Sequence, residues 1–486
     1  MTSREALALA VLSAPVVSLA AVGVTPGRAV SAVAKIGAVA GGCAALALAA
    51  VALASPDQSF VGNWLVVDAA GGLLVGVIGL VATASVLVSS AYLRATPTGL
   101  VRQARRPRLY YAILFGFWTV LVAVPLAGNL GAAWLLVEAT TAASALLVGF
   151  SGRPRALEAG WKYLILTSLG LGIALLGIIL VGAGTPGGGL DSLSWPALAG
   201  FDSGAQAALV AYLMLLAGLA AKIGWAPVHN WLPDAHSEAP PPVSALLSAA
   251  LLPAVLLVAW RCEQALAPAV GRSTAQSVFV GFGLVSLAVA VPFLWQQIAW
   301  KRLLAYSSLE HIGVITLGIG FATPLALAGV VVHIAGHAVA KALGFYAATP
   351  LIAHEPRAAG HSAVGIGHTE PRLAAVLGIS LGSLAGMPPS PLFVSEVLIV
   401  AGGFQAGRPW SAAIAALLLG LGFLGLAHAL VEAVAGKSRR GRHVPAGLRA
   451  VVLLGAVSTV LLLALTLAAL WLPGSDIVDA LSRGIR

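Results

Sequence analysis

The chain has 486 residues, of which 59% are hydrophobic and only 9% are charged, and its mean hydropathy is +0.97. In soluble domains about a quarter of the residues are charged, so this composition excludes a soluble protein. The formal net charge of +10 does not indicate a nucleic-acid partner, because the basic residues occur in short segments between apolar runs.

Apolar runs of roughly 20 residues recur from end to end, and each is long enough to cross a bilayer as a helix. Because lipid offers no hydrogen-bond partner to an open backbone, we expect an all-α polytopic membrane protein with about 14 transmembrane helices. In chain order, the expected helices occupy residues 5–24, 30–54, 65–93, 109–128, 130–150, 158–183, 205–227, 241–260, 275–296, 303–322, 324–350, 372–403, 410–435 and 449–472.

Basic residues divide the connecting loops into two sets. Lys and Arg gather after the odd-numbered helices, as at Arg105 and Arg106, whereas the loops after even-numbered helices hold Arg261, Arg272 and Arg408. The positive-inside rule then predicts that the odd-numbered loops face the cytoplasm and that both termini lie outside. An even number of helices requires both termini on one side, which agrees with this orientation.

The sequence offers little for a cofactor. Its two cysteines, Cys43 and Cys262, are too few for an iron–sulfur cluster, which needs about four. It contains no dinucleotide-binding glycine motif, P-loop or Cys/His metal array. We therefore expect no cofactor, no metal and no catalytic centre on this chain.

Two of the expected helices are interrupted by glycine and proline. The helix at 205–227 runs into GWAPVHNWLPDAHSEAPPP, and the helix at 372–403 contains Gly-Met-Pro-Pro just before Glu396. Helices broken at corresponding places in two halves are typical of transporters built from repeats. We expect two inverted five-helix repeats with flanking helices, divided as 1–108 (N-terminal helices), 109–262 (first repeat), 263–436 (second repeat) and 437–486 (C-terminal helix).

Lys222 and Glu138 lie inside separate apolar helices of the first predicted repeat. A charge at bilayer depth costs a few kcal/mol, and such residues mark ion paths. The two side chains can pair. The pair is either a fixed link between helices or a switch, in which movement of the carboxylate changes whether the lysine keeps its proton.

The stretch VVHIAGHAVAKALGFYAA places His333, His337 and Lys341 four residues apart, on one face of a predicted helix. Histidine titrates near neutral pH and can both accept and donate a proton, so this stripe is suited to passing protons. A metal site is a weaker interpretation, because no third ligand is evident. Haem ligation usually needs facing helices, and plain packing is the third alternative.

Five further residues are candidates for proton entry. Asp234, His236 and Glu238 follow the first broken helix on the cytoplasmic side, where a polar interfacial loop is the competing interpretation. Glu310 and His311 are near enough to the cytoplasmic end of the next repeat's second helix to be wetted. They are therefore either a proton entry or a solvated helix end.

Several of these stretches together resemble a known family. They are AAKIGWAPVHNWLPDAHSEAPPPVSALLSAALL, KRLLAYSSLEHIGVITLGIG, VVHIAGHAVAKALGF and SLAGMPPSPLFVSEVLIV. The chain resembles the antiporter-like subunits of respiratory complex I, of Mrp-type sodium/proton antiporters and of membrane-bound hydrogenases, and it is most similar to the hydrogenase-4 and formate hydrogenlyase branch. The resemblance implies a Glu138–Lys222 pair, Lys341 as the central lysine of a second half-channel, and Glu396 as the group that exchanges protons with the outside.

The resemblance also implies partners and a setting. The chain would be a proton-translocating subunit in a prokaryotic cell (inner) membrane, beside other membrane subunits and below a cytoplasmic redox arm carried by other chains, with H⁺ or Na⁺ as the ion. A Mrp-type antiporter subunit, a partner of a bicarbonate-uptake complex, and a membrane scaffold with fixed ion pairs are the alternatives.

One departure from the family bears on the path between the half-channels. Many members carry lysine or histidine in the eighth helix, where this chain offers only Ser244 and Ser248. The connection must then run through water or through His333 and His337.

Overall fold

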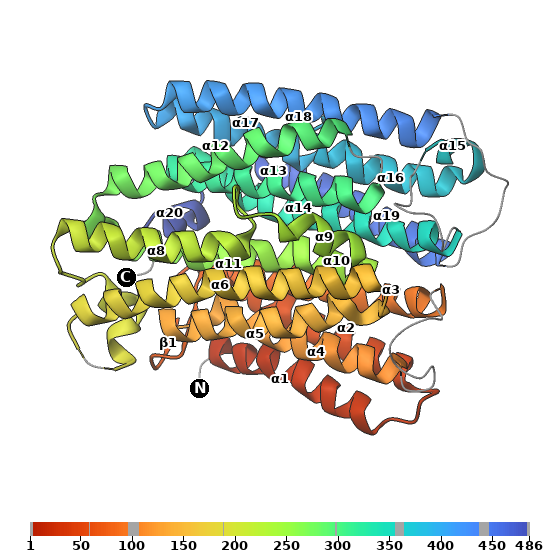
Figure 1. Ribbon diagram of the computed structural model, residues 1–486, viewed down its shortest axis with the longest axis horizontal. Coiled ribbons are helices and arrows are strands. Elements are labelled where there is room, and N and C mark those ends of the chain that lie inside the picture. Colours follow the sequence, from red (N-terminus) through yellow and green to blue (C-terminus); the bar gives the residue numbers. More distant parts are fainter. Residues whose placement is uncertain are drawn as a thin grey trace.

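The computed structural model describes residues 3–57, 59–95, 106–187, 189–296, 299–354, 364–436 and 447–483. Within these ranges, 13 helices are long and apolar enough to cross a membrane, and they run together along the long axis of the bundle (Figure 1). Two shorter apolar helices, α16 (Pro371–Leu384) and α17 (Pro391–Gln405), together occupy the twelfth predicted span at 372–403. The all-α polytopic fold is therefore confirmed.

The long helices are α1 (Ser3–Val24), α2 (Val30–Ala54), α3 (Ala69–Ala95), α4 (Arg106–Ala123), α5 (Leu130–Val148), α6 (Pro154–Gly184), α8 (Ala205–Ile223), α11 (Leu252–Val270), α12 (Arg272–Gln296), α13 (Trp300–Phe321), α14 (Pro324–His354), α16 (Pro371–Leu384), α17 (Pro391–Gln405), α18 (Pro409–Ala435) and α19 (Leu448–Ala469). The short helical elements are η1 (Val124–Leu126), η2 (Gly149–Ser151), η3 (Asp191–Leu193), α7 (Trp195–Leu198), α9 (Trp231–Glu238), α10 (Pro241–Leu246), η4 (Leu247–Leu251), α15 (Ile366–Thr369) and α20 (Asp476–Arg483). The strands β1 (Ser59–Val61) and β2 (Leu65–Val67) pair in antiparallel fashion.

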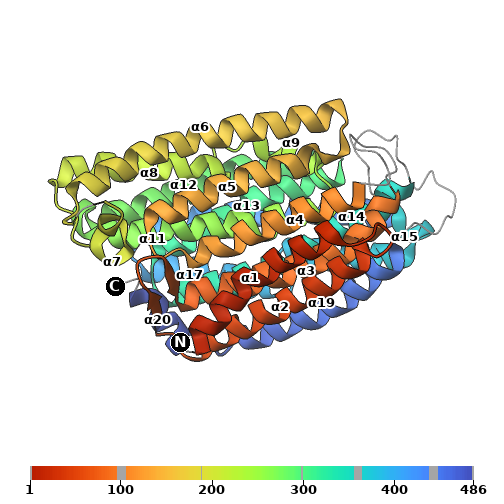
Figure 2. The ribbon, with the colours of Figure 1, turned by 90° about the horizontal axis from the view of Figure 1, so that it is seen from below.

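The chain crosses the bundle roughly in sequence order. In Figure 1 the N-terminal helices lie at the bottom, α8 to α11 lie in the middle, and α17 and α18 lie at the top. Seen from below, α6 runs along one edge and α19 along the opposite edge (Figure 2). The helices α10, η4, α11, α13 and α14 form the buried centre, where nearly every residue is shielded from solvent.

Both predicted breaks are present. Helix α8 ends at Gly224, and α16 ends just before Gly386. Both glycines have positive φ, +78° and +71°, a conformation that a side chain disfavours. Proline begins the helix after the second break, at Pro391, where its missing N–H costs nothing. The breaks therefore follow from local sequence, and the division into two inverted repeats stays a prediction.

Two segments and one additional helix depart from the prediction by more than a shift of a few residues at a helix end. The segment at 65–67 is a strand rather than the start of a helix, because it pairs with β1. The eighth predicted helix continues from 260 to Val270, so Arg261 lies inside a helix and not in a loop. A short amphipathic helix, α20, follows the last span and was not predicted.

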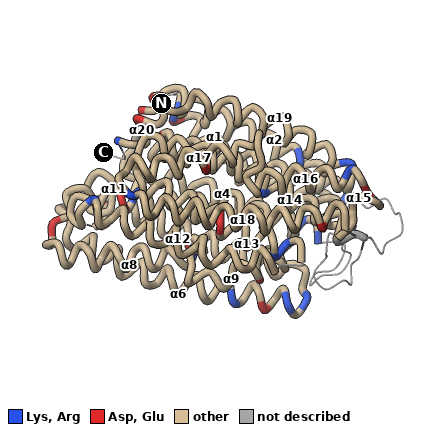
Figure 3. Tube along the Cα trace, turned by 90° about the horizontal axis from the view of Figure 1, so that it is seen from above, with Lys and Arg blue, Asp and Glu red and all other residues tan. Residues whose placement is uncertain are grey.

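Charged residues gather near the two ends of the bundle, and few mark the middle (Figure 3). Helix α1 begins and α20 ends at the same end (Figure 1), as an even number of spans requires. The basic residues Arg102, Arg105, Lys437, Arg439, Arg440 and Arg442 lie outside the described residues.

Candidate functional site

Lys222 is fully buried at the last turn of α8, directly before the first break. Its ammonium donates to the Thr141 hydroxyl of α5, at 2.7 Å, and to the Tyr163 hydroxyl of α6. The Lys222 nitrogen also lies 4.5 Å from the centre of the Tyr163 ring, where a cation–π attraction adds to the hydrogen bonds. Two neighbouring helices, α5 and α6, therefore hold this lysine through neutral groups.

Glu138 belongs to the same cluster but forms no ion pair with Lys222 within 4 Å in the described structure. Its carboxylate accepts a hydrogen bond from Ser168 at 2.6 Å, and its other oxygen is buried with no protein partner among the described residues. Glu138 lies one turn before Thr141, which itself contacts the lysine. The predicted pair is thus present as neighbours that interact electrostatically, without a direct ion pair.

Three histidines meet in the second half. His311 of α13 lies with its Nδ1 atom 3.1 Å from the Nε2 atom of His333 on α14, and the ring centres of His311 and His337 are 5.2 Å apart. The Nδ1 atom of His333 is 2.8 Å from the Ser395 hydroxyl of α17. All three histidines are fully buried. The predicted stripe of His333 and His337 is therefore joined by His311 from a second helix.

Lys341 is fully buried one helical turn beyond His337. Its ammonium donates to the Leu304 carbonyl at 3.1 Å and to the Ser307 hydroxyl, both in α13. Glu310 lies close enough to interact electrostatically with this ammonium. Lys341 therefore has neutral hydrogen-bond partners, as Lys222 has.

Glu310 and His311 are not at a wetted helix end. Glu310 is 3% exposed and His311 is fully buried, because α13 is enclosed by neighbours along its whole length. A Cβ atom on Gly422 of α18 would lie 2.0 Å from a Glu310 carboxylate oxygen, so this carboxylate is pressed against the glycine. Their burial contradicts the solvated helix end, and the role of proton entry stays a prediction.

Glu396 is half-buried on α17, just after the second break. A Cβ atom on Gly386 would lie 2.6 Å from a Glu396 carboxylate oxygen, so the carboxylate rests against the break itself. Glu396 also lines an apolar groove of about 370 Å³ between α17 and α18. It therefore connects the buried histidines with the periphery of the bundle.

The eighth predicted helix holds a link that the sequence did not reveal. Ser248 lies in the π-helical turn η4, a feature often found at functional sites, and its hydroxyl is 2.7 Å from that of Ser308 on α13. Ser308 donates to the Leu304 carbonyl at 2.8 Å, which is the carbonyl that also accepts from Lys341. Ser244, by contrast, donates only to backbone carbonyls, the closest being that of His236 at 2.8 Å.

The three candidates around α9 separate into one buried and two partly exposed residues. Both ring nitrogens of His236 are buried with no protein partner among the described residues. Burial, reinforced by the positive charges of Lys301 and Lys341, lowers the pKa of His236 to about 3. Asp234 and Glu238 instead form surface ion pairs, the first with Arg302 and Lys162 and the second with Arg153.

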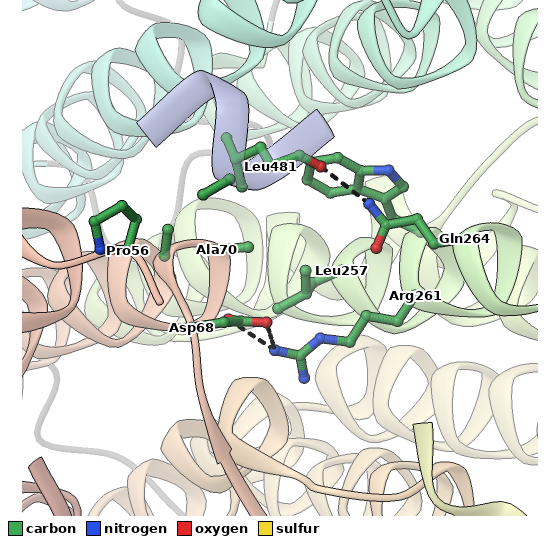
Figure 4. A pocket seen from close by; sticks show the side chains of 10 residues that line it. Pro56, Asp68, Ala70, Leu257, Arg261, Gln264 and Leu481 are labelled. Atoms are coloured by element: carbon green, nitrogen blue, oxygen red, sulfur yellow. Dashed lines mark hydrogen bonds and ion pairs between the residues drawn. The ribbon is translucent and has the colours of Figure 1, made fainter. Parts of the chain in front are cut away.

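Two buried basic residues escaped the sequence analysis because both were counted as loop residues. Lys301 donates to the Ser237 carbonyl at 2.8 Å and to that of Ala239, so it caps the end of α9. Arg261 donates to both carboxylate oxygens of Asp68, at 2.9 and 3.0 Å, beneath the C-terminal helix α20 (Figure 4). Asp68 is the last residue before α3, and its side chain also accepts from the Gly71 N–H at 2.6 Å.

One group has the atoms to bind a metal ion. His311, His333 and Glu396 each offer a ligand atom, and these atoms lie within 4.8 Å of one another. The sequence indicated no third ligand for His333, because His311 and Glu396 come from other helices.

The interior of the bundle thus contains lysine, hydroxyl, imidazole and carboxyl groups close to one another. Groups of these kinds can exchange protons.

This all-helical bundle with ionisable groups along its interior defines a class, the polytopic membrane proteins that carry ions through buried polar residues. A family model described as "NADH:quinone oxidoreductase/Mrp antiporter, TM" matches residues 127–422, which is more than half of the chain. The chain belongs to this family of antiporter-like subunits.

A curated relative supports the family, and solved structures share the fold. A hydrogenase-4 component F homolog from Methylacidiphilum infernorum (isolate V4) is 32% identical over 324 residues, which cover 65% of this chain and 67% of that protein. The fold is similar to a chain of the Mrp complex from Dietzia sp. DQ12-45-1b, with a TM-score of 0.83, 22% identity and coverage of 99% and 97% of the two chains. It is also similar to a chain of an archaeal membrane-bound sulfane sulfur reductase, with a TM-score of 0.85, 19% identity and coverage of 98% and 96%.

Proposed function

We propose that this chain translocates protons as a membrane subunit of a redox-driven complex of the hydrogenase or NADH:quinone oxidoreductase type. The family and the hydrogenase-4-related protein support this assignment. The observation that carries it is the environment of Lys341. This lysine is fully buried, its hydrogen bonds go to neutral groups, and other polar side chains lie on both sides of it, toward Glu396 and toward Ser248. A lysine whose hydrogen bonds go to neutral acceptors, rather than to a direct ion-pair partner, can lose and regain a proton.

The proposed path in the second half runs from Lys341 toward Glu396. His337 lies one turn from the lysine, and His311 contacts His333 directly. Each imidazole can accept a proton at one nitrogen and donate from the other. Glu396, beside the second break, is the proposed exchange point with the outside.

The proposed link toward the first half runs through hydroxyl groups. Ser308 and Lys341 both donate to the Leu304 carbonyl, and Ser308 is hydrogen-bonded to Ser248. Ser248 lies at the centre of the molecule, where α10, η4 and α11 pack. In the first half, approach of the Glu138 carboxylate would favour the charged form of Lys222, and its withdrawal would release the proton. This movement is the proposed coupling step to the rest of the complex.

The proposed orientation places the end that carries α9 in the cytoplasm and both termini outside. The described basic residues around α9, such as Arg153, Lys162 and Arg302, support it under the positive-inside rule. We expect other membrane subunits beside this chain in a prokaryotic inner membrane. A cytoplasmic arm on other chains would hold the redox groups, with none on this chain.

A Mrp-type cation/proton antiporter is the second candidate, supported by the similarity in fold to the Mrp chain. The buried lysine and imidazole nitrogens favour H⁺ over Na⁺, since hard cations are held by oxygen ligands.

The test uses inverted membrane vesicles that contain the intact complex. Oxidation of its electron donor should acidify the vesicle interior in sodium-free buffer, and mass spectrometry of the purified complex should find redox subunits. Loss of an imposed interior acidity when external Na⁺ is added, with no redox subunit present, would favour the antiporter.

A further inference from the structure

The histidine cluster and Glu396 together have the ligand atoms of a metal site. His311, His333 and Glu396 come from α13, α14 and α17, and one ligand atom of each lies within 4.8 Å of the other two. Two imidazoles and one carboxylate form the ligand set of many open zinc sites, which leave one position free for water or a further ligand. Imidazole nitrogens also favour Zn²⁺ and its neighbours over Mg²⁺ or Ca²⁺.

The distances suit such an ion. The facing nitrogens of His311 and His333 are 3.1 Å apart, and two nitrogens bound tetrahedrally at about 2.0–2.1 Å stand about 3.3 Å apart. His333 is already oriented by the Ser395 hydroxyl on its other nitrogen, at 2.8 Å. An outer hydrogen bond of this kind holds the ring of a metal-binding histidine in place.

His337 gives independent evidence of a ligand at this cluster. Both ring nitrogens of His337 are buried with no protein partner among the described residues, and its ring centre is 5.2 Å from that of His311. Buried polar atoms are normally satisfied, so these nitrogens are available to an ion or to its water.

We propose that His311, His333 and Glu396 bind a divalent transition-metal ion of the Zn²⁺ class, with His337 beside the open position. Binding replaces the N–H···N hydrogen bond between His311 and His333 with two nitrogen–metal bonds, and the proton of that hydrogen bond moves to the outer ring nitrogen of the same histidine, so both imidazoles bind in the neutral form. Glu396, the half-buried member, supplies the negative charge and faces the apolar groove between α17 and α18. Binding itself does not depend on the proposed function.

The consequence for transport does rest on the proposed function. An ion on these nitrogens removes the direct link between His311 and His333, so proton movement through the second half stops. Lys341 opposes the ion, because its positive charge acts on all three imidazoles. Lys341→Gln should therefore strengthen metal binding, an effect that binding at surface histidines would not show.

The test is titration of the purified full chain with Zn²⁺, followed by calorimetry, with Mg²⁺ as the metal expected not to bind. We expect one Zn²⁺ per chain and at least tenfold weaker binding in His311→Gln, His333→Gln and Glu396→Gln. His428→Gln is the matched control, because His428 is an exposed histidine on α18 outside the cluster. Equal affinity in the three cluster variants and the control overturns the proposal.

Zinc X-ray absorption of the unmodified chain gives a second readout that does not depend on the stability of variants. Two imidazoles and a carboxylate around the ion support the site, and thiolate or purely aqueous ligation contradicts it. Tight binding at the cluster together with unimpaired proton translocation in vesicles would uphold the metal site and refute the proton path through His311 and His333.

Discussion

Ser248→Ala tests the hydroxyl link between the two halves. The substitution removes the 2.7 Å hydrogen bond to Ser308 and leaves the Ser308 bond to the Leu304 carbonyl in place. One neutral hydrogen bond contributes about 1 kcal/mol, so the fold should tolerate the change. If a proton crosses this link, loss of the hydroxyl adds about 1.4 kcal/mol or more to the barrier, which slows translocation at least about tenfold.

Ser244→Ala is the matched control, because it removes a buried hydroxyl near the start of the same span that donates only to backbone carbonyls. Proton uptake is followed with a pH-sensitive dye in inverted vesicles and normalised to the rate of electron transfer. We expect a fall in protons moved per electron for Ser248→Ala and none for Ser244→Ala. Equal ratios in the two variants would show that protons do not pass through Ser248.

Three further predictions concern other parts of the molecule. Tyr163→Phe removes one acceptor of Lys222 and should slow translocation several-fold without loss of assembly, measured in the same vesicles. Arg261→Met leaves Asp68 buried without its partner and should destabilise the protein by about 3–5 kcal/mol, seen as a lower unfolding temperature that Asp68→Asn partly restores. The pKa of His236 is lowered to about 3 in the folded protein, so between about pH 3 and 6.5 this histidine is protonated in the unfolded chain and neutral in the folded one. The difference should lower the free energy of unfolding by about 2 kcal/mol at pH 5 and should vanish above pH 7. His236→Gln should remove that part of the acid sensitivity in unfolding experiments, and an unchanged pH profile would contradict the assignment.

The spans and both helix breaks were predictable because their causes are local. Length and apolarity determine a membrane helix, and glycine with positive φ followed by proline interrupts it, as at Gly224 and Gly386. The buried lysines were predictable for the same reason, since an ionisable residue within an apolar run is visible in the sequence.

The partners of these residues were not predictable, because they come from distant parts of the chain. Ser308 meets Ser248 across 60 residues, and Tyr163 meets Lys222 across 59. Arg261 was misplaced because a helix boundary estimated from hydropathy stopped ten residues before the observed end at Val270. Its partner Asp68 lies 193 residues away, and no local pattern relates the two.

The most direct test of the central claim compares Lys341→Ala with Lys35→Ala in vesicles that contain the assembled complex. Lys341 is fully buried beside the histidine cluster, whereas Lys35 is partly exposed on α2, in the N-terminal part of the chain. Proton translocation per electron should be lost in Lys341→Ala and kept in Lys35→Ala, with the same amount of assembled complex on native gels. Unchanged translocation in an assembled Lys341→Ala complex would contradict the role of Lys341 as the proton carrier of this subunit.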